Sequence, residues 1–194
     1  MEGASLSVND LACRRGDRVL FRGLTFALAA GEALQVAGPN GTGKSSLLRI
    51  IAGLLRPFEG SVDKTCEVAL LDDKLALDEH LPLGRALAFW DRIDRGGYGP
   101  DALARLGLAT LTDVPVRFLS TGQRKRAAIL QSNARQAGLW LLDEPLNGLD
   151  AAAAADFQRY VGEFLARGGT AVIASHQSFE VPGLKQVDLA GYAP

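Results

Sequence analysis

One run of eight residues has the residue types and spacing needed to hold a phosphate group. The segment from Gly38 to Ser45 reads GPNGTGKS and fits the pattern G-x-x-x-x-G-K-[ST]. Glycines let backbone N–H groups converge on an anion without an obstructing Cβ, and a helix that opens at the end of the loop adds the positive end of its dipole. The nucleotide-binding residues predicted from this run are Gly38, Pro39, Asn40, Gly41, Thr42, Gly43, Lys44, Ser45 and Ser46.

Two side chains of this run have defined roles in phosphate chemistry. Lys44 can reach the β- and γ-phosphates of a nucleoside triphosphate, and the Ser45 hydroxyl can bind Mg²⁺. The apolar segment 33–37 leads into the run, and the segment 44–55 after it has helical periodicity. Strand, glycine loop and helix in this order form the context in which the motif binds phosphate. ATP and Mg²⁺ are therefore the predicted ligands.

A pair of acids follows a second apolar run. Residues 139–142 read LWLL and lead directly into Asp143 and Glu144. We expect Asp143 to bind Mg²⁺ through water, and Glu144 to orient and deprotonate the attacking water. Alone, such a pair is weak evidence, because acids at this position also cap the next helix. Its occurrence with the glycine loop favours the chemical role.

The rest of the chain supplies the elements that position these motifs. After residue 33, strand-like runs alternate with helical runs, which predicts a mostly parallel sheet wrapped by helices. We expect strands at 6–13, 19–28, 33–37, 60–62, 68–71, 139–142 and 170–174, helices at 44–55, 122–137 and 151–166, and two short helices between 81 and 108.

Further motifs stand in an order found in one family of nucleotide hydrolases. Residues 119–123 read LSTGQ and resemble the ABC signature, with Thr121 in place of the first of its two glycines. The acid pair comes next, NGLD at 147–150 resembles a D-loop, and a short apolar run then ends near His176. The chain therefore resembles the ABC ATPases over nearly its whole length.

This resemblance implies a fold, a reaction and a second copy of the chain. The fold is α/β, a P-loop NTPase of the ABC type with a mostly parallel sheet core, antiparallel N-terminal strands and a small helical subdomain at roughly 75–135, inside one domain, 1–194. The reaction is ATP hydrolysis, with Lys44, Glu144 and His176 as catalytic residues. Two copies would associate head to tail, so that each nucleotide lies between the glycine loop of one chain and the signature of the other. The residues implied to act across this dimer are Ser120, Thr121, Gly122, Gln123 and Asp150.

Two positions depart from the family's pattern. Most members carry a glutamine that contacts Mg²⁺ and the attacking water, but the expected position falls at Asp72, Asp73 and Lys74. An acid here either replaces the glutamine or is a solvated turn residue. Adenine usually stacks on an aromatic residue, where this chain has the stretch RRGD. Arg15 of that stretch either covers the base with its guanidinium or is an ordinary turn charge. The missing aromatic residue predicts weak discrimination between ATP and GTP.

Composition narrows the class of protein. The chain has 194 residues and a formal net charge of -1, which disfavours a dedicated nucleic-acid binder. We find no signal peptide and no apolar run of the ~18–20 residues that span a membrane. We therefore expect a cytoplasmic subunit, with any membrane part supplied by another chain. Cys13 and Cys66 form no CxxC pair and are expected to be buried or incidental thiols.

Three segments resemble one ABC subfamily in particular. These are 18–24, 118–126 and 139–150, together with Ser175-His176-Gln177. They are similar to the ATP-binding subunit of the bacterial cytochrome c maturation system, the haem exporter subunit. That resemblance implies a peripheral protein on the cytoplasmic side of the inner membrane, integral membrane partner subunits, and ATP hydrolysis that releases a haem-loaded chaperone. The alternatives are the ATPase of another small exporter and a soluble ABC clamp, which the single domain and neutral charge disfavour.

Two surface features allow two interpretations each. The basic triplet Arg124-Lys125-Arg126 either helps to hold the phosphate of the opposing subunit or forms the solvated flank of a helix. Phe89 and Trp90 either dock a membrane subunit or belong to a local core, and a local core is the more usual role of aromatic residues at helical spacing.

Overall fold

The segments with the predicted chemistry follow strands of one parallel sheet. The computed structural model describes residues 5–72, 76–94, 100–131 and 137–194. Within them a five-stranded sheet has the order β5-β6-β7-β3-β8, and every neighbouring pair is parallel. Its strands are β3 (Ala33–Ala37), β5 (Val68–Leu71), β6 (Leu139–Asp143), β7 (Thr170–Ala174) and β8 (Leu184–Asp188). Because parallel strands end at the same edge of a sheet, the loops after β3, β6 and β7 meet there.

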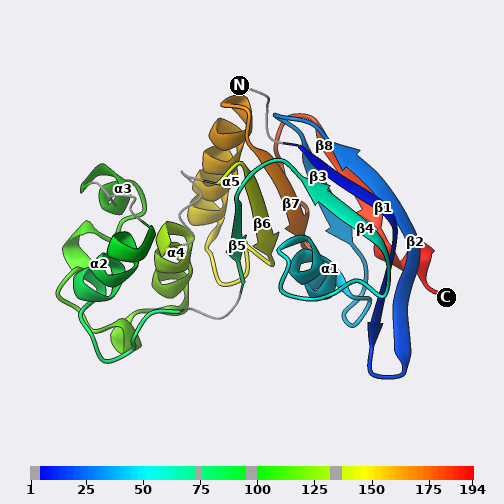
Figure 1. Cartoon of the computed structure of the whole chain (residues 1–194). Helices are drawn as coiled ribbons and strands as arrows, with labels where there is room; N and C mark the ends of the chain where they lie inside the picture. Colours follow the sequence, from blue (N-terminus) through cyan, green and yellow to red (C-terminus); the bar gives the residue numbers. More distant parts are fainter. Residues whose placement is uncertain (1–4, 73–75, 95–99, 132–136) are drawn as a thin grey trace.

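An antiparallel sheet covers one face of the parallel sheet. Strand β1 (Leu6–Arg15) lies between β2 (Arg18–Leu28) and β4 (Glu59–Lys64), antiparallel to both. Apolar side chains of β1 and β2 form one core with helix α1 (Lys44–Ile51) and with residues of β3, β6 and β7. Figure 1 shows α1 beside the carboxyl ends of the parallel strands. The glycine loop, which leads into α1, is thus supported by the main core.

The other face of the parallel sheet is covered by α5 (Ala151–Ala166) (Figure 1). Trp140 of β6 is fully buried there. Its ring makes edge-to-face contacts with Phe157, Tyr160 and Phe164 of α5, with centroids 5.6 to 5.7 Å apart. Edge-to-face geometry matches the positive rim of one ring to the negative face of another. These contacts fix α5 against the strand that leads into the acid pair.

A helical segment lies to one side of the sheet. It consists of α2 (Leu83–Asp94), α3 (Pro100–Arg105) and α4 (Thr121–Gln131), with short 3₁₀ turns at Ala109–Leu111 and Val116–Phe118. The segment has its own small core, to which Leu83, Leu108 and Leu119 contribute. Figure 1 shows these helices grouped away from α1. A third 3₁₀ turn, Leu189–Tyr192, follows β8. In the part of the chain that the structure describes, no helix is both long and apolar enough to cross a membrane.

The predicted fold class, with a parallel core, antiparallel N-terminal strands and a helical subdomain, is confirmed. The bounds of the strands at 33–37, 68–71 and 170–174 were predicted correctly. The helix expected at 44–55 ends at Ile51, because the chain turns at Gly53, whose φ is +81°. The helix expected at 122–137 is described only to Gln131. Strand β8 was not predicted.

The two aromatic residues of α2 have different environments. The indole N–H of Trp90 donates to the carbonyl oxygen of Ala76 at 2.6 Å, and its ring packs against the core of the helical segment. Phe89 is 56% exposed. The local-core interpretation thus holds for Trp90, and Phe89 is left on the surface.

Candidate nucleotide-binding site

The glycine loop has the backbone that the motif requires. Gly38, Gly41 and Gly43 have φ angles of +136°, +83° and +108°, a region that other residues rarely adopt. Lys44 is buried, and its Nζ donates to the carbonyl oxygens of Gly38 at 2.7 Å and Pro39 at 3.3 Å. The loop therefore wraps around the ammonium group of its own lysine.

Of the three glycines in the loop with positive φ, Gly43 has the least room for a side chain. A Cβ there would lie 3.1 Å from two ring carbons of Phe21 and 3.2 Å from Cβ of Leu20. We expect Gly43→Ala to displace the loop, to lower the free energy of unfolding by about 1–3 kcal/mol, and to weaken ATP binding by at least about tenfold. Denaturant unfolding and ATP titration measure the two effects.

The matched control for Gly43→Ala is Gly16→Ala. Gly16 also has a positive φ of +59°, but a Cβ there would meet no atom within 4 Å. Gly16→Ala should therefore lower the free energy of unfolding through backbone strain alone and bind ATP normally. Wild-type ATP affinity in Gly43→Ala would show that contact with Leu20 and Phe21 of β2 does not hold the loop in the form that binds ATP.

The loop opens onto a cavity of about 430 Å³ at the carboxyl edge of the parallel sheet. The residues that line it are Leu20, Asn40, Gly41, Gly43, Lys44, Ser45, Ser46, Asp143, Glu144, Asn147 and His176. The other predicted loop residues shape the loop instead; Thr42 Oγ1, for example, donates to the carbonyl oxygen of Pro39 at 2.9 Å. The glycine loop, the acid pair and the histidine are thus brought together in one place, as predicted from the sequence.

Glu144 and His176 contact each other at this cavity. Nδ1 of His176 lies 2.8 Å from Oε2 of Glu144, and the backbone N–H of His176 donates to the same oxygen at 3.4 Å. The histidine side chain is 56% exposed, whereas that of Glu144 is 15% exposed. Glu144 has a φ of +45°, and its N–H donates to the carbonyl oxygen of Ala174 at 2.8 Å. The backbone of Glu144 is therefore strained, and its hydrogen-bonded carboxylate beside the phosphate loop is suited to orient and deprotonate water.

The oxygen donors of the cavity fit a hard cation. Ser45 offers a hydroxyl, and Asp143, which is buried at the end of β6, offers a carboxylate. Mg²⁺ prefers oxygen ligands and is usually bound by one or two protein groups together with substrate phosphates. These two side chains thus have the chemistry of a magnesium site.

The signature residues form the N-terminus of α4. Ser120 is the N-cap: its Oγ accepts from the N–H of Gln123 at 3.2 Å, and Oε1 of Gln123 accepts from the N–H of Ser120 at 2.8 Å. This reciprocal pair is a capping box. Thr121 and Gly122 lie against Gly148, since a Cβ on Gly148 would be 2.9 Å from Cγ2 of Thr121, and a Cβ on Gly122 would be 3.1 Å from O of Gly148.

None of the signature residues lines the cavity of its own chain. The carboxylate of Asp150 caps α5, accepting from the N–H of Ala153 at 2.8 Å. Within one chain, therefore, the structure does not bring Ser120, Thr121, Gly122, Gln123 or Asp150 to the nucleotide cavity.

Two residues of the basic triplet of α4 bond to the backbone of the same chain. Lys125 is buried, and its Nζ donates to the backbone oxygen of Asp143 at 3.4 Å. Arg124 donates to the carbonyl oxygens of Leu119 at 3.1 Å and Arg117 at 2.8 Å. The solvated-flank interpretation is therefore wrong for these two residues. They hold α4 to the acid-bearing strand and to the preceding turn.

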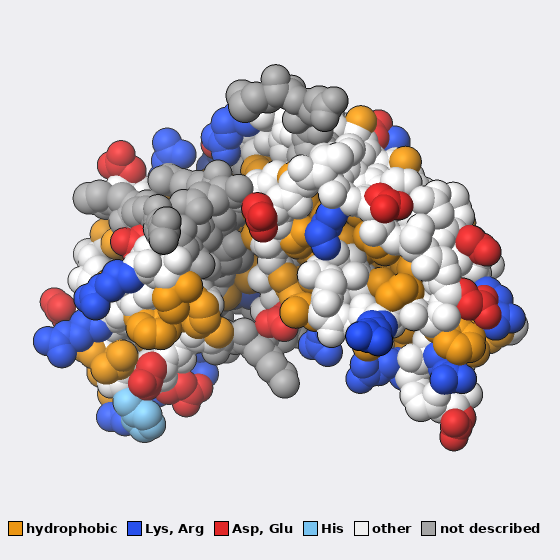
Figure 2. All heavy atoms as spheres, viewed as in Figure 1, with side chains coloured by type: hydrophobic (Ala, Val, Ile, Leu, Met, Phe, Trp, Pro, Cys, Tyr) orange, Lys and Arg blue, Asp and Glu red, His pale blue; other side chains and the backbone are white. Residues whose placement is uncertain are grey.

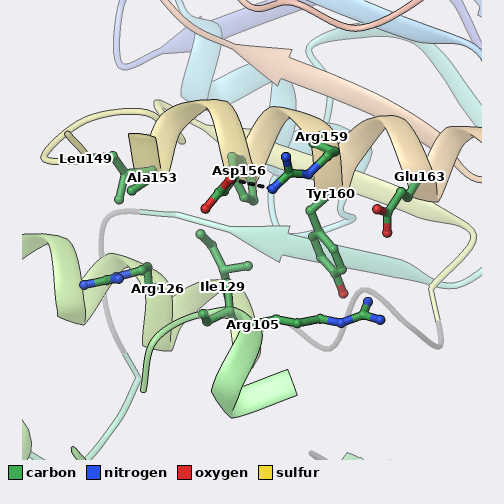
Figure 3. Close-up of a pocket in the computed structure, with 11 residues that line it drawn as sticks. Arg105, Arg126, Ile129, Leu149, Ala153, Asp156, Arg159, Tyr160 and Glu163 are labelled. Carbon is green, nitrogen blue, oxygen red and sulfur yellow. Dashed lines mark hydrogen bonds and ion pairs between the residues drawn. The ribbon is translucent and has the colours of Figure 1, made fainter. Parts of the chain in front are cut away.

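Arg126 lines a second pocket, of about 230 Å³, on the side of α4 that faces α5. Figure 3 shows Tyr160 and Arg105 reaching toward each other at one end of this pocket, and Asp156 bonded to Arg159 along α5. None of the predicted nucleotide-binding or signature residues lines it.

The described residues at the two departures from the family's pattern both lie outside the nucleotide cavity. Asp72 forms an ion pair with Arg49 of α1 at 3.9 Å and does not line the nucleotide cavity. Asp73 and Lys74 lie outside the described residues. Arg15 is exposed at the turn between β1 and β2 and does not line the cavity either.

The two cysteines are free, as expected. Burial raises the pKa of the Cys13 thiol, although a hydrogen bond with Ser46 opposes this. Cys13 is thus a neutral side chain in the main core beneath the glycine loop.

Sequence reasoning missed Leu20 and Asn147 as cavity residues. Asn147 opens the NGLD segment, so its position next to the acid pair was a usable signal. Leu20 comes from the β2 hairpin, and only the packing of that hairpin against the glycine loop places it here.

Comparison with known proteins also identifies the chain as an ABC transporter ATPase. The ABC transporter family matches residues 21–147. A cytochrome c biogenesis ATP-binding export protein, CcmA, of Novosphingobium aromaticivorans is 54% identical over 194 residues, which cover 100% of both chains. The protein of the same name from Zymomonas mobilis is 46% identical, covering 97% of this chain and 86% of the relative.

A solved structure of an ABC transporter ATP-binding protein from Pyrococcus furiosus superposes with a TM-score of 0.82 at 20% identity, covering 98% of this chain and 100% of the other. At that identity the likeness concerns the fold alone. The two relatives, by contrast, are similar to this chain in sequence over nearly its full length. The chain therefore belongs to the ATP-hydrolysing subunits of ABC transporters, within the family of cytochrome c biogenesis ATP-binding export proteins.

Proposed function

We propose that ATP hydrolysis by this chain powers an inner-membrane complex of cytochrome c maturation, in which the released energy frees a haem-loaded chaperone. The observation that carries the proposal is the 54% identity, over the whole of both chains, to a cytochrome c biogenesis export protein. The alternatives, another small exporter or a soluble ABC clamp, have no comparable support.

The test is genetic and biochemical. A strain that lacks this protein should contain no haem-stained c-type cytochromes, the wild-type gene should restore them, and a Glu144→Gln gene should not. Glu163→Gln, which removes an acid of α5 that lines the second pocket, is the control and should restore them. Normal c-type cytochromes in the deletion strain would overturn the proposal.

The residues of the cavity have distinct proposed roles. Lys44 binds the β- and γ-phosphates, and the glycine-loop N–H groups hold the phosphate oxygens. Ser45 and Asp143 would hold Mg²⁺, which would neutralise the charge that develops on the phosphates. Glu144 takes a proton from the attacking water, and His176, 2.8 Å from its carboxylate, keeps that carboxylate in place.

The proposed working form is a head-to-tail dimer of two copies. The own-chain cavity is lined by the glycine loop, the acid pair and His176 but by no signature residue. The N–H groups at the start of α4 suit a phosphate, and a second copy is the available source of them. In each composite site one chain would supply Lys44, Asp143 and Glu144, while its partner would supply the Ser120–Gln123 tip and Asp150.

The proposed location is peripheral, on the cytoplasmic side of the inner membrane, bound to an integral membrane subunit. Large hydrophobic side chains are exposed on the helical segment: Phe89, Ile93 and Phe118. Figure 2 shows hydrophobic side chains gathered on this part of the surface. Exposed apolar clusters of this kind typically mark a contact with another protein. We assign this surface to the membrane subunit.

A further inference from the structure

A row of side-chain amides runs from the edge of the parallel sheet to the loop of His176. Nε2 of Gln186, in β8, donates to Oε1 of Gln35, in β3, at 3.3 Å. Nε2 of Gln35 donates to the backbone oxygen of Gln177 at 2.7 Å, and Nε2 of Gln177 donates to Oδ1 of Asn147 at 3.1 Å. The row therefore joins the sheet to two loops that line the nucleotide cavity.

Gln35 is the buried member of this row. It is 4% exposed, in a strand whose other residues are all apolar. A buried amide costs free energy unless its donors and acceptor are bonded, and an apolar side chain would suit the interior of a strand better. The amide of Gln35 uses both its oxygen and its nitrogen. Its position is thus explained by what it binds, not by the stability of the strand.

Gln35 and Ser175 both donate to the backbone carbonyl oxygen of Gln177. Oγ of Ser175, a fully buried side chain, donates to the oxygen of Gln177 at 3.0 Å and is itself 3.0 Å from the N–H of Gln177. The backbone of Gln177 is thus held at its N–H and at its carbonyl oxygen, directly after His176. The imidazole is more than half exposed, and a hydrogen bond to Glu144 at 2.8 Å orients its ring. The hydrogen bonds from Gln35 and Ser175 to the backbone of Gln177 form a clamp on the residue that follows His176, and this clamp restricts where the imidazole can lie.

We propose that Gln35 is a positioning residue for ATP hydrolysis: by holding the backbone carbonyl of Gln177 it places His176 against Glu144. The inference rests on the roles proposed above for Glu144 and His176. The inference predicts different effects on ATP binding and on hydrolysis. Binding depends on the glycine loop and Lys44, whereas hydrolysis depends on the clamp. Loss of the Gln35 amide should therefore lower kcat and leave ATP affinity unchanged.

The test uses the ATPase co-purified with its membrane subunits. Gln35→Met keeps the length and volume of the side chain but removes both hydrogen bonds. We expect kcat to fall about 10- to 100-fold, as misplacement of a reacting group by roughly 1 Å does, with an unchanged dissociation constant for ATP. The control is Thr170→Val, which removes a buried hydrogen bond to the oxygen of Ala29 at the opposite end of β7. It should cost similar stability and leave kcat unchanged.

A double-mutant cycle tests whether Gln35→Met lowers kcat through His176. In a His176→Ala background, whose residual turnover is followed by release of radiolabelled phosphate, Gln35→Met should have no further effect. Full turnover in His176→Ala alone would overturn the role proposed for His176 and this inference with it. If His176→Ala is impaired but Gln35→Met turns over like wild type, or if the two losses multiply, the catalytic roles stand and the positioning role is wrong.

Discussion

Glu144→Gln should lower ATP turnover by about 1,000-fold, the scale of a lost general base, while ATP binding is retained. The amide keeps the shape of the side chain and can still accept a hydrogen bond from His176, which lies 2.8 Å away. It cannot, however, take a proton from water. The glycine loop and Lys44 are untouched, so the nucleotide should remain bound. Phosphate release and equilibrium ATP binding are the two measurements.

The outcome of this variant decides which group is the base. Glu163→Gln on α5, away from the nucleotide cavity, should hydrolyse ATP like wild type. Turnover near the wild-type rate in Glu144→Gln would show that the proton goes elsewhere, and Glu144 would then be a structural residue at a strained turn.

Ser120→Asp should lower turnover by about 100-fold or more, because a carboxylate at the tip of α4 would face the terminal phosphate held by the partner. Asp and Ser are equally good N-caps, so the helix should remain intact. The uncharged control is Ser120→Asn, which caps equally well and should retain much more activity. ATP binding to a single chain should be normal in both variants, since Ser120 does not line the cavity of its own chain.

Steady-state hydrolysis, single-chain ATP titration and thermal unfolding together test this pair. Equal loss of turnover in the Asp and Asn variants would argue for a purely structural role of the capping box. Wild-type turnover in Ser120→Asp would show that the signature has no role in ATP hydrolysis.

Each motif of this chain lies within a short stretch of sequence, and the motifs could therefore be predicted from the sequence. Strands buried on both faces, such as 33–37 and 170–174, are short and mostly apolar runs with clear ends. The edge strand β8 is half exposed and polar, and only its pairing with β3 makes it a strand. Ser120 and Gln123 form a capping box in the structure, and its S-x-x-Q spacing is also a local feature of the sequence.

Burial and contacts that depend on packing between distant segments could not be predicted from the sequence. Lys125 is charged and was placed on a solvated flank or near a phosphate, yet packing of α4 against β6 buries it. Gln35 and Gln177 are neighbours only because β3 and β7 pair in parallel. Arg15 and Asp72 carry charges suited to a nucleotide site, but the β1–β2 turn and the Arg49 ion pair place them outside the cavity.

A crosslink between two differently tagged copies most directly tests whether each nucleotide is held by two chains. One copy carries Asn40→Cys in the exposed glycine loop and the other Ser120→Cys, both in a background with Cys13 and Cys66 replaced by alanine and with Glu144→Gln to slow hydrolysis. With ATP, a short thiol crosslinker should give a product that carries both tags, and with ADP the product should be absent. No such product with ATP, or the same yield with either nucleotide, would contradict the composite site.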